Sequence, residues 1–291
     1  MTALFRLLAR VPLPLMHALG RAFGWLVWWL APDYRRRFRE NAEAAGFAPE
    51  QWRPAIGAAG EMVAELPWLW ARPVGESVLP RVVRWEGAEV FEAALAERKG
   101  VIMVVPHLGS WEMYGQAVGE RFVKEHGPIT ALFRPSRKKW IAGLVEGSRD
   151  RPGLQTLPTT VKGVRGLMRT LKEGGYTGIL PDQVPPLGQG VWAPFLGRPA
   201  YTMTLLPRLA QTTGAKVFLG VCERLPRGRG YVIRFIPFTG TALTDRDATP
   251  EAAAAAMNEG IAQLVRSLPG QYVWDYARYK QPKNEPMEVA Q

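Results

Sequence analysis

The sequence has few of the residues that form disulfides and thiolate metal clusters. Its 291 residues include one cysteine, Cys222, and three histidines. A single thiol cannot form an intrachain disulfide, and a zinc site built on several thiolates is excluded. Serine- and glycine-rich linkers, repeats and low-complexity tracts are also absent, so the composition does not divide the chain. Hydrophobic residues make up 47% of the sequence, which is enough to bury a sizeable core.

Acidic residues are in the minority. The chain has 26 Asp and Glu against 37 Lys and Arg, a formal net charge of +11 and a pI near 10.0. This balance favours an anionic partner such as nucleic acid, an anionic membrane or an acidic substrate. The basic residues flank an apolar segment or are dispersed, and zinc-finger and RNP-like patterns are absent. We therefore expect no nucleic-acid partner.

An apolar segment near the N-terminus has the composition of a membrane-associated helix. Leu15–Leu30 contains 16 mostly apolar residues, which would extend roughly 24 Å as a helix, slightly short of a bilayer core. Arg21 near its middle is costly at the bilayer centre unless it pairs or snorkels. Its three tryptophans suit a membrane interface. A convincing cleavage site is absent, which argues against a cleaved signal peptide.

Arginines surround this segment and are more numerous after it. Those that precede it are Arg6 and Arg10, and those that follow it are Arg35, Arg36, Arg37 and Arg39. The positive-inside tendency then places the rest of the chain in the cytoplasm. We expect residues 1–40 to form a membrane-anchoring helix with a basic flank, either a short span or an interfacial helix. A buried amphipathic helix of a soluble domain is the alternative.

Hydrophobic patterns predict an α/β fold for residues 41–291. Mixed helices reach about Trp70, and strands then alternate with helices. The expected strands are Arg81–Trp85, Val101–Val105, Ile129–Phe133, Leu154–Leu157, Thr177–Leu180, Lys216–Cys222 and its hairpin partner Tyr231–Ile236. The expected helices are Glu89–Glu97, Glu112–Lys124, Lys139–Val145, Val161–Lys172, Met203–Thr212 and Pro250–Ser267. This order predicts a mixed, mostly parallel central sheet wrapped by helices.

One stretch, "VIMVVPHLGSWEMYG" at 101–115, has the character of a catalytic site. His107 follows an apolar strand, at the edge where parallel sheets gather their chemistry. Glu112 falls in the first turn of the next helix, where a carboxylate suits the helix dipole. We expect Glu112 to fold back onto His107, fix its tautomer and stabilise its protonated form. His107 would then be a general base.

The base needs a hydroxyl to deprotonate. Ser110 is a candidate nucleophile, but its context is "HLGSWE", and the G-x-S-x-G pattern is absent around every serine. This argues against an α/β-hydrolase. A simpler scheme is direct transfer, in which His107 deprotonates the hydroxyl of an acceptor and that oxygen attacks an activated acyl group.

Five ordered segments resemble a known family. "PHLGSWE" is similar to the H-x4-E signature of the late acyltransferases of lipid A biosynthesis, within the H-x4-D/E superfamily of lysophospholipid and glycerolipid acyltransferases. "FRP" at 133–135, "GILPDQ" at 178–183, "FLGRPAYT" at 195–202 and "QYVWDYARYK" at 271–280 also resemble that family, as does the N-terminal apolar helix with "RRRFREN". Nearly the whole chain is covered.

The resemblance implies a reaction and a location. A fatty acyl group would move from acyl carrier protein to a hydroxyl of a lipid A precursor, at the cytoplasmic side of a bacterial inner membrane. His107 would be the base and Glu112 its orienter. Arg134, in the family's R-P motif, would hold anionic substrate or developing charge, and Asp182 and Arg198 match further positions. No metal or redox cofactor is implied.

Several of these residues could instead have a structural or surface role. Arg134 also suits a solvated basic face, Asp182 a turn cap, and Arg198 a structural role. The "DRD" at 245–247 resembles a glycosyltransferase metal site, but its position before Thr249 and Pro250 favours loop and N-cap chemistry.

Other functions also remain open. The P-E-G motif of glycerolipid acyltransferases is absent. The runner-up functions are an acyltransferase for phosphatidylinositol mannosides or lysophospholipids with an acyl-CoA donor, a metal-dependent glycosyltransferase and a non-catalytic membrane scaffold.

Overall fold

A computed structural model describes residues 2–73, 75–133, 151 and 153–283. Its centre is a seven-stranded sheet in the order β1-β9-β8-β2-β5-β3-β4. Neighbouring strands are parallel except for β8 and β9, which form the expected antiparallel pair. The strands are β1 (Val82–Glu86), β2 (Val101–Val104), β3 (Ile129–Phe133), β4 (Leu154–Pro158), β5 (Tyr176–Ile179), β8 (Lys216–Arg224) and β9 (Tyr231–Pro237). The sheet is therefore mixed and mostly parallel.

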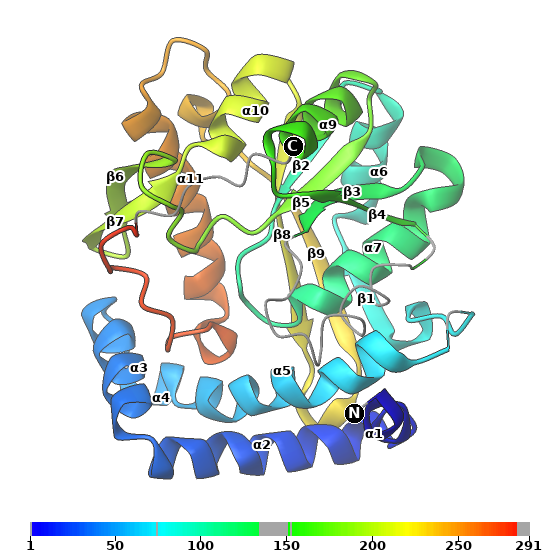
Figure 1. The fold of residues 1–291 in the computed structure, drawn as a ribbon, viewed down its shortest axis with the longest axis vertical. Coiled ribbons are helices and arrows are strands. Elements are labelled where there is room, and N and C mark those ends of the chain that lie inside the picture. Colours follow the sequence, from blue (N-terminus) through cyan, green and yellow to red (C-terminus); the bar gives the residue numbers. More distant parts are fainter. Residues whose placement is uncertain (1, 74, 134–150, 152, 284–291) are drawn as a thin grey trace.

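Helices cover both faces of this sheet (Figure 1). They are α1 (Thr2–Leu8), α2 (Leu13–Leu30), α3 (Pro32–Ala44), α4 (Pro49–Trp52), α5 (Pro54–Ala71), α6 (Ala88–Ala96), α7 (Trp111–His126), α9 (Val161–Lys172), α10 (Leu205–Thr213) and α11 (Pro250–Ser267). Val101 and Met103 of β2 belong to the core beneath α6 and α7, whereas Ile102 and Val104 belong to the core beneath α9, α10 and α11. Side chains alternate along a strand, so burial on both faces requires a continuous apolar run.

Most of the expected elements are confirmed. The bounds of β3, α9 and α11 match those expected from the sequence. For the other expected strands and helices after residue 80 that the structure describes, each end lies within about two residues of the expected end. The expected helix Lys139–Val145 lies outside the described residues. Thr249 caps α11 by accepting a hydrogen bond from the amide of Ala252 at 3.2 Å, which confirms N-cap chemistry after "DRD".

The sequence patterns missed one hairpin. Strands β6 (Gly190–Phe195) and β7 (Arg198–Met203) form a separate antiparallel pair in which Pro194 faces Pro199. Proline normally argues against a strand because it lacks an N–H, but a two-stranded ribbon has open edges that need no donor. Leu196 and Gly197 have φ angles of +46° and +79°, as a tight two-residue hairpin turn requires.

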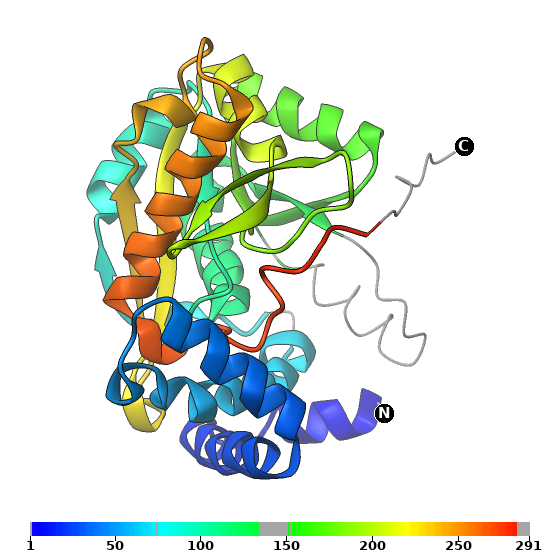
Figure 2. The same ribbon diagram turned by 90° about the vertical axis from the view of Figure 1, so that its left-hand side faces the viewer.

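Helices α2 and α5 run side by side across one end of the sheet (Figures 1 and 2). Their backbones approach so closely that a Cβ on Gly60 would lie 1.9 Å from the carbonyl oxygen of Gly20. Arg21 forms an ion pair with Glu61 at 2.7 Å, and His17 lies 3.3 Å from Glu65. The arginine within the apolar segment is thus paired with a carboxylate of α5.

The outer face of α2 is apolar. Five of its exposed apolar residues recur at a spacing of three or four, which places them along one side of the helix. We call these five residues the α2 stripe: Leu15, Leu19, Phe23, Leu26 and Leu30. Among the described residues, no helix has both the length and the apolar character that crossing a membrane requires.

Candidate active site

Two neighbouring strands end in the same way and bring two titratable side chains together. Val104 of β2 pairs with Ile179 of β5. Each strand is followed by an apolar residue, a proline and then a titratable residue, which is His107 after β2 and Asp182 after β5. Equal offsets from a parallel register place both residues at the same carboxyl edge. They meet although 75 residues separate them in sequence.

His107 and Asp182 form a two-point contact. The Nδ1 atom of His107 lies 2.7 Å from Oδ1 of Asp182, and the backbone N–H of His107 donates to Oδ2 at 2.9 Å. The second ring nitrogen, Nε2, lies 3.1 Å from Nε2 of Gln183. A proton on Nδ1 satisfies the carboxylate and leaves the Nε2 lone pair to accept from the Gln183 amide. The imidazole is 18% exposed and the carboxylate 3%, so Nε2 is the accessible basic atom.

Surrounding groups keep Asp182 ionised. Burial alone would raise the pKa of its carboxyl, but the ring and amide of His107, together with Arg278, hold that pKa below its usual value. Arg278 is buried and is fixed by hydrogen bonds to the carbonyl of Tyr201 and the hydroxyl of Thr202. Burial first, and then the Asp182 charge, raise the pKa of Tyr272. An ionised Asp182 favours the protonated imidazole that forms when His107 takes a proton.

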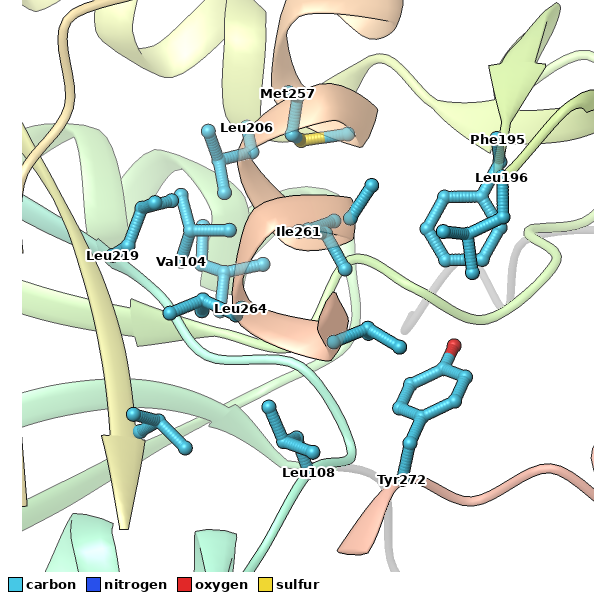
Figure 3. Close-up of a cluster of buried hydrophobic side chains, with 14 of the residues drawn as sticks. Val104, Leu108, Phe195, Leu196, Leu206, Leu219, Met257, Ile261, Leu264 and Tyr272 are labelled. Carbon is cyan, nitrogen blue, oxygen red and sulfur yellow. The ribbon is translucent and has the colours of Figure 1, made fainter. Parts of the chain in front are cut away.

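Tyr272 connects this centre to the core beneath α9–α11. Figure 3 shows its side chain pointing toward Phe195 and Leu196 of the hairpin, with Leu108 to one side of it. Its ring centroid lies 6.5 Å from that of Phe195. Asp182 is itself buried, and removal from water strengthens each electrostatic interaction around it.

Glu112 is not the carboxylate that holds the His107 ring in this structure. Asp182 occupies that position, and the Oε2 atom of Glu112 accepts a hydrogen bond from Nε1 of Trp70 at 3.2 Å. The physical reason is the helix geometry: Glu112 in the first turn of α7 faces the end of α5, where Trp70 lies. Trp111 instead contacts the imidazole, edge to face, with ring centroids 4.9 Å apart.

The remaining expected site residues have different surroundings. Arg134 lies outside the described residues. Arg198 is exposed at the start of β7, and its guanidinium stacks on the ring of Tyr279 at 4.0 Å. Arg198 therefore lies at the β6–β7 hairpin. Among the described residues, the side chains that hydrogen-bond His107 are those of Asp182 and Gln183.

The turn after His107 requires glycine. Gly109 has a φ of +64°, and a Cβ there would lie 2.1 Å from the carbonyl oxygen of Cys222. That carbonyl accepts from the backbone N–H of Ser110 at 2.8 Å. Cys222 is buried in β8, as expected for a packed strand residue. The close approach of β8 thus fixes the backbone that carries His107 into α7.

A buried charge network supports the same turn. Glu65 of α5, 1% exposed, pairs with Arg224 through two hydrogen bonds of 2.6 and 2.8 Å and also accepts from the hydroxyls of Ser110 and Tyr231. Arg224 donates to the carbonyl of Gly109 at 3.0 Å. Burial would raise the pKa of Glu65, but Arg224 lowers it to about 2. Ser110 is thus a buried structural hydroxyl rather than an exposed nucleophile.

Sequence reasoning gave no role to Gln183, Tyr272, Arg278 or Glu65. A signal existed for two of them. The strand endings "VVPH" and "ILPDQ" both contain two apolar residues, then a proline and then a polar residue. This shared pattern indicates that residues 182 and 183 take the same place after their strand as His107 does after its own. Glu61 and Glu65, four residues apart in an otherwise apolar helix, mark buried carboxylates that need partners.

The comparisons with known proteins decide the family. The family model described as "Bacterial lipid A biosynthesis acyltransferase" matches residues 1–281. The chain belongs to this family. The resemblance inferred from the ordered motifs is confirmed.

Similar members of the lipid A acyltransferase family are distant relatives. The chain is 27% identical to the lipid A biosynthesis lauroyltransferase of Escherichia coli strain K12, over 76% of this chain and 68% of that protein. It is 29% identical to a lipid A biosynthesis acyltransferase of Haemophilus influenzae, over 65% of this chain and 56% of the relative. A second Haemophilus influenzae protein of that description is 25% identical over 97% of this chain and 90% of its own length. Family membership supports an acyltransferase activity.

Proposed function

We propose that this protein transfers a fatty acyl group from acyl carrier protein to a hydroxyl of a lipid A precursor. One observation carries the chemistry: His107 is held through Nδ1 by a buried carboxylate, and its Nε2 atom is accessible at the carboxyl edge of the sheet. Family membership supports acyl transfer as the reaction and a lipid A-type acceptor. The geometry supports a base that acts on a hydroxyl of the substrate itself.

The reaction proceeds without a covalent enzyme intermediate. The acceptor hydroxyl replaces Gln183 at Nε2 of His107 and gives its proton to that nitrogen as its oxygen attacks the thioester carbonyl carbon. The carbon–sulfur bond then breaks, and the leaving sulfur takes the proton from Nε2. The products are the new ester and the free thiol of the carrier, and His107 returns to its starting tautomer.

Asp182 and Glu112 have separate roles in this scheme. Asp182 orients the imidazole and stabilises its positive charge, because it stays ionised and contacts Nδ1 directly. Glu112, held by Trp70 in the first turn of α7, places a negative charge at the start of the helix that follows the catalytic loop. Arg134 and Arg198 are proposed to bind anionic groups of the substrate, a task that suits guanidinium.

The enzyme works on a membrane surface through α1 and α2. The α2 stripe is fully apolar and exposed, and Leu4 and Leu7 of α1 are also exposed. Arginines of α3 follow directly and suit anionic headgroups. These features support a helix that lies in the interface of the bacterial inner membrane, with the sheet on the cytoplasmic side.

A transfer assay tests the proposed function. Purified protein receives a radiolabelled acyl chain either on acyl carrier protein or on coenzyme A. A tetra-acylated lipid A precursor, a lysophospholipid or a mannosylated phosphoinositide is supplied in separate tubes. We expect label on the lipid A precursor, resistance to EDTA, and a loss of about 10²–10⁴ in rate for His107→Ala. Label on another acceptor alone, or transfer from acyl-CoA alone, would contradict the substrate assignment. Undiminished transfer by folded His107→Ala would contradict the mechanism.

A further inference from the structure

The exposed side of α9 is mainly basic. Gly163, Leu167 and Leu171 are buried on its inner side, where α9 covers β3, β4 and β5. The outer side has four exposed cations at successive spacings of three, four and three residues, which aligns them along one face. We call them the α9 stripe: Lys162, Arg165, Arg169 and Lys172. The helix, "VKGVRGLMRTLK", has no acidic residue.

These cations have no partners within the described part of the chain. No ion pair or hydrogen bond joins the side chains of the α9 stripe to any described residue, whereas on α3 Arg36 pairs with Asp33 and Glu40, and Arg39 lies 3.9 Å from Glu43. Like charges three or four residues apart repel each other and weaken a helix. An anionic partner that binds along the stripe would remove this repulsion.

Helix α9, which carries the stripe, lies far from the proposed membrane surface. In Figures 1 and 2, α9 lies at the end of the molecule opposite to α1 and α2. The helix begins after β4, with Thr160 as its N-cap, at the sheet edge where His107 and Asp182 also lie. A partner bound along α9 would thus reach the catalytic edge from the side opposite the bilayer. An acidic soluble protein fits this position, and a lipid surface does not.

We propose that the α9 stripe is the docking surface for the acidic carrier protein that delivers the acyl thioester. This inference rests on the proposed function, because it assigns a surface to the donor named there. Four aligned cations would be complementary to an acidic helix of the carrier. Exposed charges of this kind speed encounter and set orientation, and their effect falls with salt.

The test compares donors. A variant with all four residues changed to Gln, K162Q/R165Q/R169Q/K172Q, is assayed with acyl carrier protein and with a short acyl-pantetheine thioester, which has no protein surface. We expect KM for the acyl carrier protein to rise about tenfold or more, since exposed ion pairs contribute little individually but add up. We expect kcat/KM for acyl-pantetheine to stay within about twofold. Rising salt should raise the wild-type KM and leave the variant's nearly constant.

A matched variant removes the same charge elsewhere, through Arg81→Gln, Lys99→Gln, Lys124→Gln and Arg266→Gln. It should keep the wild-type KM for the acyl carrier protein. An equal rise in KM for both variants would overturn the proposal, because it would reflect net charge alone. An unchanged KM in the α9 variant together with weaker binding to anionic vesicles would also overturn it and assign the stripe to lipid. Wild-type protein inactive with every donor would instead contradict the proposed function.

Discussion

The Nδ1 atom of His107 and the Oδ1 atom of Asp182 lie 2.7 Å apart at the ends of adjacent parallel strands. This contact assigns the tautomer of the histidine and leaves one basic nitrogen facing outward. The backbone N–H of His107 donates to the same carboxylate, so Asp182 also ties the loop after β2 to the loop after β5. The proposed chemistry therefore depends on Asp182 as directly as on His107.

Asp182→Asn should lower kcat by about 10²–10⁴ with little change in KM for either substrate. The amide keeps the shape of the carboxylate but removes its charge, and it can hold the opposite tautomer of His107. Steady-state kinetics with both donor and acceptor varied would measure the effect. Asp182→Glu, which keeps the charge, should retain more activity than the amide. Full activity in folded Asp182→Asn would contradict the role given to this residue.

Glu112→Gln should cost less than Asp182→Asn, about tenfold to 10²-fold in kcat/KM, because Glu112 bonds Trp70 and not the imidazole. Trp70→Phe, which removes the indole N–H, is the matched variant and should reproduce part of this loss. Assays of the three variants under one set of conditions give the ranking. A larger loss for Glu112→Gln than for Asp182→Asn would restore Glu112 as the residue that orients His107.

The fold was predictable because its strands are buried on both faces. Continuous apolar runs such as Val101–Val104, bounded by glycine or proline, mark such strands directly. The β6–β7 hairpin was missed because Pro194 and Pro199 lie within its strands, and local rules treat proline as a breaker.

The site was predictable only in part. His107 stands out because a strand end presents it, but its partner depends on which strand lies beside β2, and strand order is not a local property of sequence. Glu112 is near His107 in sequence, whereas β5 lies beside β2 in the sheet and brings Asp182. The same limit applies to Glu65 and Arg224, which come from α5 and β8 and meet only after the sheet has formed.

Acid should destabilise the protein through Glu65. Its folded pKa of about 2 lies below the ordinary value of 4.5. Between these values the unfolded chain binds the proton more readily, so the stability that this group contributes is complete above about pH 4.5 and is lost as pH falls toward 2. Glu65→Gln should lower the free energy of unfolding near neutral pH by about 3–5 kcal/mol, because Arg224 is left buried without its counter-charge.

Denaturant unfolding at several pH values would measure both effects. Glu65→Gln should also flatten the dependence of stability on pH between about 2 and 4.5. The double variant Glu65→Gln/Arg224→Met should recover part of the lost stability, since it removes the unpaired charge. If the single and double variants are equally stable, the ion pair is not the reason for the loss.

Binding to anionic vesicles should depend on the α2 stripe. Phe23 and Leu26 are more than half exposed, and the transfer of such side chains from water to a lipid interface is favourable by about 1 kcal/mol each. Phe23→Gln/Leu26→Gln should therefore weaken vesicle binding about tenfold or more in a co-sedimentation assay. Activity on detergent-dispersed acceptor should remain, because both residues lie on the face of α2 opposite α5. Val90→Gln, an equally exposed apolar position on α6, should bind vesicles as the wild type does. Equal losses at both positions would mean that general surface hydrophobicity, and not α2, governs membrane binding.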